Sequence, residues 1–370
     1  MTLLSADEVQ QLVYQVWGAS FVLSLLVGVL IHRGHFCTLG AISDWVLMRD
    51  ATRLRQWALA VAVAIAGFGV MAWLGWLSPL NTIYASSQLP WLSALFGGGL
   101  FGIGMVLASG CSSKSLVRMA AGNLKSLVVL LVMAVSALAA MRGLTAVWRV
   151  HGLDKVAIDL PHGPFVGQWL SSVTGWDLRA GLGISAALVS LLMVSWILKD
   201  RRFHTVFNWV TGAGLGLLVV ALWWVSGVLG YVPEHPDTLE PLFLTTQSAR
   251  MEALSFTAPV GYWLDAFMYY SDGSKRLTLG MVTVAGVVLG ACGSALQQGS
   301  FRWEGFTQRA DLVRHLVGGA LMGTGGVLAM GCTFGQGLTG LSTLSLGSML
   351  SVLGIFAGTW GALQWQMRQA

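Results

Sequence analysis

The stretches GGGLFGIGMVLASGC (97–111) and GGALMGTGGVLAMGC (318–332) decide the fold of this 370-residue chain. They match at ten of fifteen positions, and both end in Gly-Cys. Small and polar residues follow each copy (SSKS and TFGQG), and then a further apolar run begins. A match of this length and spacing indicates an internal duplication. The two halves of the chain are therefore predicted to share one architecture.

The composition around these stretches is that of a membrane protein. Only 10% of the residues are charged, whereas soluble domains average about 25%. Hydrophobic residues make up 55% of the chain, and there are 47 glycines in addition. These values exclude disorder, a disulfide scaffold and a coiled coil. The net charge of +5 does not indicate nucleic-acid binding, because the basic residues lie between apolar runs rather than on one face.

Apolar runs of about 18 residues or more mark transmembrane helices, because the hydrocarbon core needs roughly 20 residues at helical rise. The predicted fold is an all-α polytopic membrane protein with about nine such helices. Their predicted ranges are 13–31, 57–77, 91–109, 125–141, 181–198, 209–230, 277–296, 313–330 and 347–365.

Lysine and arginine set the predicted orientation. Fourteen of the 21 basic residues fall on one side of this topology, and the N-terminus and the connections 78–90 and 331–346 contain none. By the positive-inside rule, the N-terminus faces outward and the C-terminus faces the cytoplasm. The first ten residues lack the basic region of a cleaved signal peptide. No predicted span interior contains Asp or Glu, which argues against a proton-coupled pump.

The parity of the spans makes the duplication an inverted one. Cys111 follows the third span and Cys332 the eighth, so the two copies run in opposite directions. Pairing spans one to four with spans six to nine leaves the fifth span as a connector, a 4+1+4 plan seen in many transporters. The predicted units are 1–142, 143–205 with the connecting span, and 206–370.

The repeat also predicts re-entrant loops with short half-helices entering from both faces. Matching 34–46 to 255–267 with a shift of one residue makes Thr257 the counterpart of Cys37, whereas pairing 33–37 with 298–302 would make two spans parallel and is rejected. Irregular backbone at membrane depth persists only where it is buried or lines a cavity, and half-helix N-termini attract anions. The predicted breaks are 34–46, 110–122, 255–268 and 331–343, and the candidate backbone positions are Gly110, Ser112, Gly331 and Thr333.

The glycines have a second interpretation. Stripes of small residues also allow helices to pack closely without any role in transport. This reading applies best to the glycines inside the two duplicated spans, and less well to Gly110 and Gly331 beside the cysteines.

The four cysteines provide the clue to the substrate. No CxxC motif occurs, and the group His32, His35 and Cys37 lacks the usual zinc spacing, so neither a metal nor a cofactor is expected. Cys292 reads as a small buried hydrophobe within a span. The other cysteines, Cys37, Cys111 and Cys332, each fall in a predicted break.

Neutral thiols suit a soft anion. A thiol in apolar surroundings stays protonated and is a weak donor, whereas a thiolate repels an anion by about 4 kcal/mol at 4 Å for an effective dielectric near 20. Conduction needs several sites that bind weakly enough to release their ligand. The pattern therefore favours a small soft anion passed between thiols.

Four motifs carry a family resemblance over nearly the whole chain. They are HRGHFCTLGAISD (32–44), GMVLASGCSSKSLVRMAAG (104–122), FRWEGFTQRADLVRHLVGGALMG (301–323) and GGVLAMGCTFGQGL (325–338). They resemble the YeeE/YedE family of sulfur-compound transporters. The resemblance implies a non-enzymatic importer of thiosulfate, or of a similar small sulfur oxyanion, in the bacterial inner membrane.

The resemblance also implies a route and a partner. The anion would pass from Cys332 on the outer side to Cys111 and then to Cys37 near the cytoplasm. Arg118 belongs to the matching pattern, and Lys114 stands where the family commonly has a small residue. A TusA-like sulfur carrier is an expected cytoplasmic partner. Two alternatives stay open, a transporter of a selenium oxyanion and an intramembrane thiol oxidoreductase.

Overall fold

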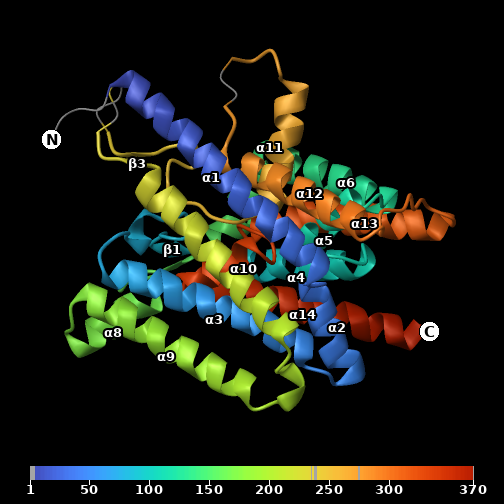
Figure 1. The fold of residues 1–370 in the computed structure, drawn as a ribbon, viewed down its shortest axis with the longest axis horizontal. Helices are drawn as coiled ribbons and strands as arrows, with labels where there is room; N and C mark the ends of the chain where they lie inside the picture. Colours follow the sequence, from blue (N-terminus) through green and yellow to red (C-terminus); the bar gives the residue numbers. More distant parts are fainter. Residues whose placement is uncertain (1–4, 235, 237–239, 274–275, 370) are drawn as a thin grey trace.

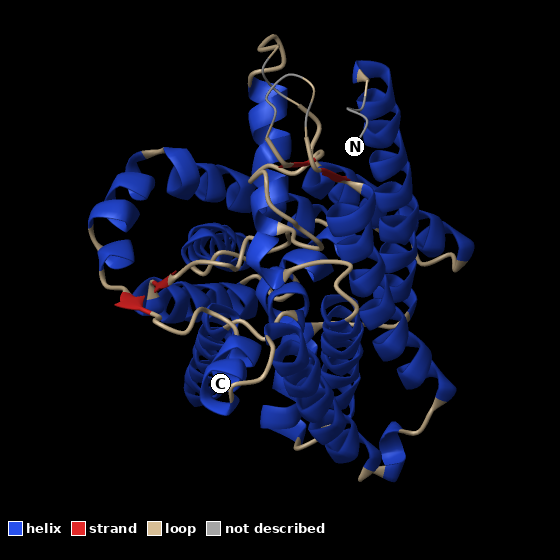
Figure 2. Cartoon of the chain, turned by 90° about the vertical axis from the view of Figure 1, so that its left-hand side faces the viewer, coloured by secondary structure: helices blue, strands red, loops and turns tan. Residues whose placement is uncertain are grey.

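The computed structural model describes residues 5–369 apart from 235, 237–239 and 274–275. Helices dominate the described part, and the strands are short segments (Figure 2). The long helices pack side by side into one bundle (Figure 1). They are α1 (Ala6–Arg33), α3 (Thr52–Trp73), α4 (Trp91–Leu107), α6 (Leu124–Arg142), α9 (Leu178–Leu198), α10 (Val206–Trp224), α12 (Leu279–Gln297), α13 (Arg309–Leu328) and α14 (Leu346–Gln369).

Shorter elements connect the long helices. The strands form two antiparallel pairs, β1 with β2 and β3 with β4. The short α-helices are α2 (Thr38–Met48), α5 (Ser112–Ala120), α7 (Leu144–His151), α8 (Val166–Thr174) and α11 (Thr257–Met268). The remaining elements are η1 (Pro79–Asn81), η2 (Leu153–Lys155), η3 (Arg201–Phe203), the π-helices η4 (Val225–Leu229) and η5 (Gly335–Gly340), and the strands β1 (Gln88–Leu89), β2 (Ile158–Asp159), β3 (Tyr231–Val232) and β4 (Leu242–Phe243).

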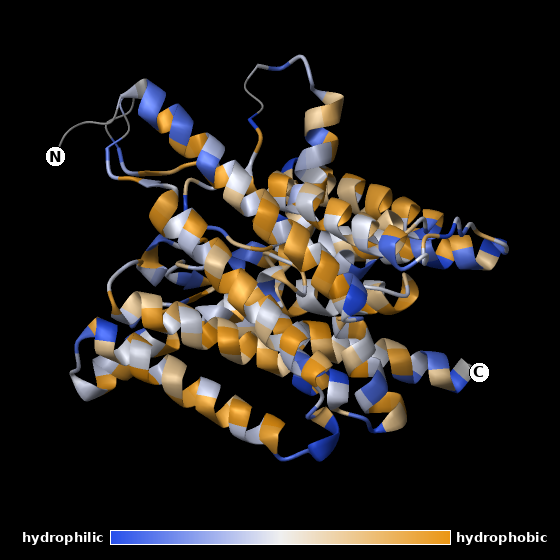
Figure 3. Cartoon of the chain, in the orientation of Figure 1, coloured by the Kyte–Doolittle hydropathy of each residue, from blue (hydrophilic) through white to orange (hydrophobic). Residues whose placement is uncertain are grey.

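The fold is that of an all-α polytopic membrane protein. In the described part of the chain, eight helical stretches are long and apolar enough to cross a membrane. Hydrophobic residues cover most of the length of the long helices (Figure 3). The predicted span 313–330 coincides with α13, which is not among the eight; its first turns contain Arg309, Asp311 and Arg314. The predicted count of nine is therefore not confirmed.

The first helix begins earlier than the hydrophobic pattern indicates. The apolar run starts near residue 13, but α1 starts at Ala6. Ser5 accepts a hydrogen bond from the backbone of Glu8, whose carboxylate accepts one in return from the Ser5 N–H, 2.7 Å away. This capping box nucleates a polar first turn that hydropathy alone does not register.

A short helix begins within each predicted break. These helices are α2, α5, α11 and η5. Two of them run from the core to the surface: Thr38 is 2% exposed and Met48 68% in α2, and Thr257 is 1% exposed and Met268 64% in α11. The re-entry of these segments relative to a bilayer stays a prediction.

Several helices of one half pack on helices of the other half, and the corresponding pairs recur when the two halves are interchanged. The helix α4 packs on α14 as α13 packs on α6, and α1 packs on α12 as α10 packs on α3. In the same way, α2 contacts α3 and α14, whereas α11 contacts α12 and α6. A two-fold relation between the halves would produce this pattern, which is consistent with the predicted inverted repeat without confirming its units.

The helix α9, the predicted connector span, lies outside this exchange. It packs on α3 and on the short helix α8. Arg55, near the start of α3, forms an ion pair with Asp200 just after α9. The connecting helix is thus tied to one side of the bundle.

Candidate functional site

The backbone takes the same path before three of the cysteines. The residue two positions before each cysteine is left-handed although it is not glycine, with φ values of 47° at His35, 55° at Ser109 and 57° at Met330. The next residue then donates to a carbonyl five positions back, which closes the preceding helix. These bonds are Phe36 to Ile31 (3.3 Å), Gly110 to Met105 (3.0 Å) and Gly331 to Gly326 (2.7 Å).

Each cysteine then starts a new helix. The carbonyls of Cys37, Cys111 and Cys332 accept the first helical hydrogen bond, from the residue four positions on, at 2.9, 2.9 and 2.7 Å. The thiol of Cys37 also accepts from the Gly40 N–H, and that of Cys332 from the Gly335 N–H, each at 3.4 Å. The thiols therefore lie where one helix has ended and the next begins.

The fourth break has the same helix start without a cysteine. Phe256 accepts the first helical hydrogen bond, from Val260 at 3.1 Å, and Thr257 is the first residue of α11. Counted from the helix start, Thr257 is level with Thr38, whereas the sequence alignment placed it opposite Cys37. The sequence prediction is one residue out of register at this point.

The breaks meet in the core around Cys111. Its thiol lies close enough to interact with the Cys37 thiol and with the Thr333 side chain. It also lies 3.1 Å from the Ser113 hydroxyl. Cys111 and Cys332 are both fully buried. The structure therefore brings the three predicted thiol-bearing segments together at Cys111.

Three aromatic rings connect three of the breaks. Phe36 and Phe256 each pack edge-on against Phe334, with ring centroids 5.7 and 5.2 Å apart. All three side chains are 1% exposed or less. Each ring is adjacent in sequence to a Cys or Thr of a break. They form an apolar partition contributed by three of the four breaks.

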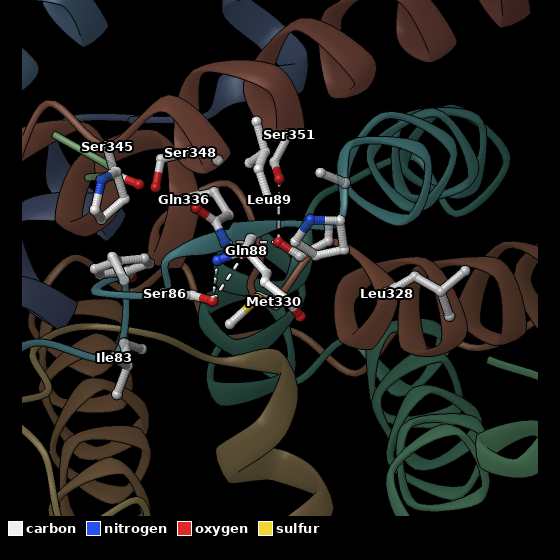
Figure 4. Close-up of a pocket in the computed structure, with 16 residues that line it drawn as sticks. Ile83, Ser86, Gln88, Leu89, Leu328, Met330, Gln336, Ser345, Ser348 and Ser351 are labelled. Carbon is white, nitrogen blue, oxygen red and sulfur yellow. Dashed lines mark hydrogen bonds between the residues drawn. The ribbon is translucent and has the colours of Figure 1, made fainter. Parts of the chain in front are cut away.

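A small chamber with a mainly apolar lining and a few polar side chains lies beside the Cys332 break (Figure 4). Its volume is about 40 Å³, room for about three water molecules. Gln336 donates from Nε2 to the Ala329 carbonyl at 2.6 Å, and the Ser351 hydroxyl donates to the same carbonyl at 3.2 Å. Gln336 Oε1 and Ser348 Oγ are buried without a hydrogen-bond partner among the described residues. The chamber thus offers unpaired polar atoms close to a thiol.

The other predicted site residues have more local roles. The left-handed residues of these turns are Ser109 and Met330, next to Gly110 and Gly331. A methyl group at Gly331 would lie 3.2 Å from Gln336 Cγ, whereas one at Gly110 would make ordinary contacts. Arg118 donates to the Ser109 carbonyl at 3.3 Å and so braces its break. Lys114 is half-buried, near Cys37.

Sequence reasoning missed Thr38, Tyr84 and Gln336. Tyr84, in the connection between α3 and α4, donates its hydroxyl to the Gly335 carbonyl. Nothing in the local sequence distinguishes these residues from ordinary polar ones. The signal that could have found Thr38 is the hydroxyl that follows each of three cysteines, in the pairs Cys-Thr, Cys-Ser and Cys-Thr.

The structure is a bundle of apolar helices with cysteines at three of its helix breaks, and the comparisons with known proteins place it in the class of sulfur-transport membrane proteins. The model of the family described as "Sulphur transport" matches residues 33–361. The chain belongs to this family.

Two relatives share one name. The thiosulfate transporter TsuA of Escherichia coli (strain K12) is 26% identical over 360 residues, covering 92% of this chain and 93% of that protein. The thiosulfate transporter TsuA of Spirochaeta thermophila is 26% identical over 356 residues, covering 93% and 97%. The resemblance seen in the sequence motifs is thereby confirmed.

Proposed function

We propose that this protein imports thiosulfate, or a closely related small sulfur oxyanion, along a path lined by the thiols of Cys332, Cys111 and Cys37. The names of its two relatives support the substrate. The observation that carries the route is the position of Cys111, whose thiol contacts Cys37 and lies beside Thr333, the neighbour of Cys332.

The chemistry of the route follows from burial. A dianion loses its hydration in the bundle, and a fixed positive charge there would hold it too tightly to release. Neutral thiols and hydroxyls donate weak hydrogen bonds instead. Successive weak sites at Cys332, Cys111 and Cys37 therefore allow an anion to enter and to leave.

The direction of import requires an energy source. Moving a dianion into a cell against an interior-negative potential of 100 mV requires about 5 kcal/mol of electrical work. We assign removal of the arriving anion to a TusA-like sulfur carrier at the cytoplasmic face. The protein is placed in the bacterial inner membrane with its N-terminus outside and its C-terminus in the cytoplasm, as the distribution of Lys and Arg predicts. Its two inverted units are 1–142 and 206–370, with 143–205 between them.

Uptake of labelled thiosulfate tests the proposal. Cells that lack other importers would express the wild-type chain, Cys111→Ala or Cys332→Ala, with the amount of protein in the membrane measured in parallel. Both variants are expected to lose uptake. Cys292→Ala is the matched control, because Cys292 lies inside the long helix α12 and not at a helix break. Full uptake by both path variants would exclude the thiol route.

One observation favours a second candidate, an intramembrane thiol oxidoreductase. The thiols of Cys37 and Cys111 contact each other, although all four cysteines are free in this structure. A redox cycle would require these two thiols to form a disulfide. Non-reducing peptide mapping of protein from actively respiring cells discriminates the two: a Cys37–Cys111 disulfide that turns over favours the oxidoreductase, and thiols that stay reduced during uptake favour the transporter.

A further inference from the structure

Each of the four breaks has a buried hydroxyl that lacks a hydrogen-bond partner among the described residues. Each of these side chains is 2% exposed or less, and none of the hydroxyls has a hydrogen bond of good geometry to any described residue. They are Thr38, Ser112, Thr257 and Thr333. Buried hydroxyls are normally paired, because leaving one unpaired forfeits its hydration without compensation.

Ordinary helical geometry does not explain these four atoms. Several other buried hydroxyls of the bundle bond to a carbonyl of their own helix, as Ser24 does to Ser20 at 2.6 Å and Thr359 to Ile355 at 2.7 Å. A residue at the start of a helix has no carbonyl one turn back to accept its hydroxyl. The four hydroxyls are thus free to donate to something that is not part of the chain.

The positions of three of these hydroxyls point to the type of ligand. Thr38, Ser112 and Thr333 each follow a cysteine directly. The Thr333 side chain also lies beside the thiol of Cys111 in the neighbouring break. Each of the three breaks therefore offers a soft donor, the thiol, next to a harder donor, the hydroxyl. Thr257 follows Phe256 and offers a hydroxyl alone.

We propose that these hydroxyls bind the oxygen atoms of the transported anion while the adjacent thiols bind its terminal sulfur. The proposal rests on the function proposed above and deepens it. The class of ligand is an oxyanion with one soft chalcogen atom and several oxygens. In each break that has a cysteine, the thiol binds the chalcogen and the hydroxyl binds an oxygen. Sulfate has only oxygens and would bind the hydroxyls alone. Thiocyanate has a soft sulfur and no oxygen, and would bind the thiols alone.

This division of labour makes Thr333 a specificity-determining residue. Valine has the shape of threonine and lacks the hydroxyl, so Thr333→Val removes the oxygen donor and keeps Cys332. A hydrogen bond to a charged group changes binding by about tenfold or more. We therefore expect Thr333→Val to weaken thiosulfate binding by about tenfold and to abolish competition by sulfate, while competition by thiocyanate stays as in the wild type.

The experiment measures binding and uptake with the full chain in lipid nanodiscs and in cells, using thiosulfate as ligand and sulfate and thiocyanate as competitors. Thr333→Ser restores the hydroxyl and is expected to restore competition by sulfate. Thr359→Val, in a helix interior, is the matched control and is expected to behave as the wild type. Cys332→Ala should give the reverse pattern, with thiocyanate competition lost.

The outcomes separate this proposal from the function on which it rests. Wild-type thiosulfate binding with both competitors unchanged in Thr333→Val and in the corresponding Thr38→Val would overturn the role of the hydroxyls and leave the importer intact. Loss of competition by both ions in Thr333→Val, with no rescue by Thr333→Ser, would also overturn it, since the residue would then act through packing. No thiosulfate binding or uptake by the wild type would instead refute the proposed function itself.

Discussion

The hydroxyl of Tyr84 donates a hydrogen bond to the carbonyl of Gly335, whose own N–H donates to the thiol of Cys332. Tyr84 is buried, at 6% exposure, and burial raises the pKa of its phenol, so the hydroxyl stays protonated as a donor. A connection in the first half of the chain thereby fixes the backbone that holds a thiol in the second half.

Tyr84→Phe is therefore expected to reduce thiosulfate uptake severalfold. The substitution keeps the ring and leaves a buried carbonyl without its donor, which costs about 1–3 kcal/mol. Uptake per molecule in the membrane and the rate of Cys332 alkylation by an impermeant maleimide, read by peptide mass spectrometry, measure the effect. Tyr231→Phe is the control, because Tyr231 is 39% exposed. Unchanged uptake and alkylation in Tyr84→Phe would show that the contact does not position the thiol.

Gly290 is expected to be essential for the packing of α1 against α12. A methyl group there would lie 2.0 Å from the Leu25 carbonyl oxygen, so the helices would have to separate. Gly290→Ala should destabilise the fold by about 1–3 kcal/mol, as overpacking commonly does. Gly293 lies on the same helix, and a methyl group there meets no described atom within 4 Å.

The thermal midpoint of the detergent-solubilised protein checks this prediction. Gly293→Ala should leave the midpoint unchanged or raise it, because alanine favours a helix over glycine. Equal midpoints for the two variants would contradict the packing argument.

Lys114 is expected to raise the rate of anion transfer near Cys37. Its ammonium lies close enough to interact with His32, His35 and Cys37, and no acidic residue is paired with it among the ion pairs of the described chain. Lys114→Gln removes a positive charge from the end of the proposed path that is predicted to face the cytoplasm. Uptake at limiting thiosulfate should fall severalfold, less so at high ionic strength, where charges are screened.

The matched control for this variant is Lys199→Gln, which removes a charge beyond the end of α9. Equal uptake by Lys114→Gln and Lys199→Gln would show that only the overall charge of that face matters.

Glu252 is expected to make the stability of the connection before α11 depend on pH. Burial raises the pKa of its carboxyl, which the Ser248 backbone and side chain partly oppose by donating to it. A raised folded-state pKa means that the folded protein retains a proton that the unfolded chain releases. This contribution to stability is complete below the ordinary carboxyl pKa and is lost as the pH rises toward the folded value.

Thermal midpoints of the wild type and Glu252→Gln across this pH range provide the measurement. The thermal midpoint of Glu252→Gln should rise relative to that of the wild type as the pH increases above the ordinary carboxyl pKa. A constant difference between the two curves would exclude a raised pKa at this residue.

Local sequence was sufficient for much of the fold. Each predicted span overlaps a long helix because an apolar run of that length has few other folds available in a membrane. The Gly-Cys repeats at 110–111 and 331–332 marked two of the helix breaks correctly. The start of α1 was missed because it depends on a capping box, and α13 was harder to classify because its first turns are charged.

The candidate site was only partly predictable. The sequence singled out Cys37, Cys111 and Cys332, and the structure brings their segments together. The contacts around these thiols could not be inferred, because they join segments far apart in the sequence. Tyr84 bonds to the Gly335 carbonyl, and Phe36 packs on Phe334. The left-handed turn at Met330 was also unpredictable, since methionine has no local preference for that conformation.

Composition and the length of the apolar runs by themselves determined that this is a helical membrane protein, and the Gly-Cys motifs predicted two of its helix breaks. They could do so because the bilayer constrains every residue of a span in the same way. Only the tertiary structure decided which breaks meet, that Cys111 lies close to both Cys37 and Thr333, and that each break leaves a hydroxyl without a partner among the described residues. Those relations depend on side-chain packing between distant segments, which no local pattern in the sequence specifies.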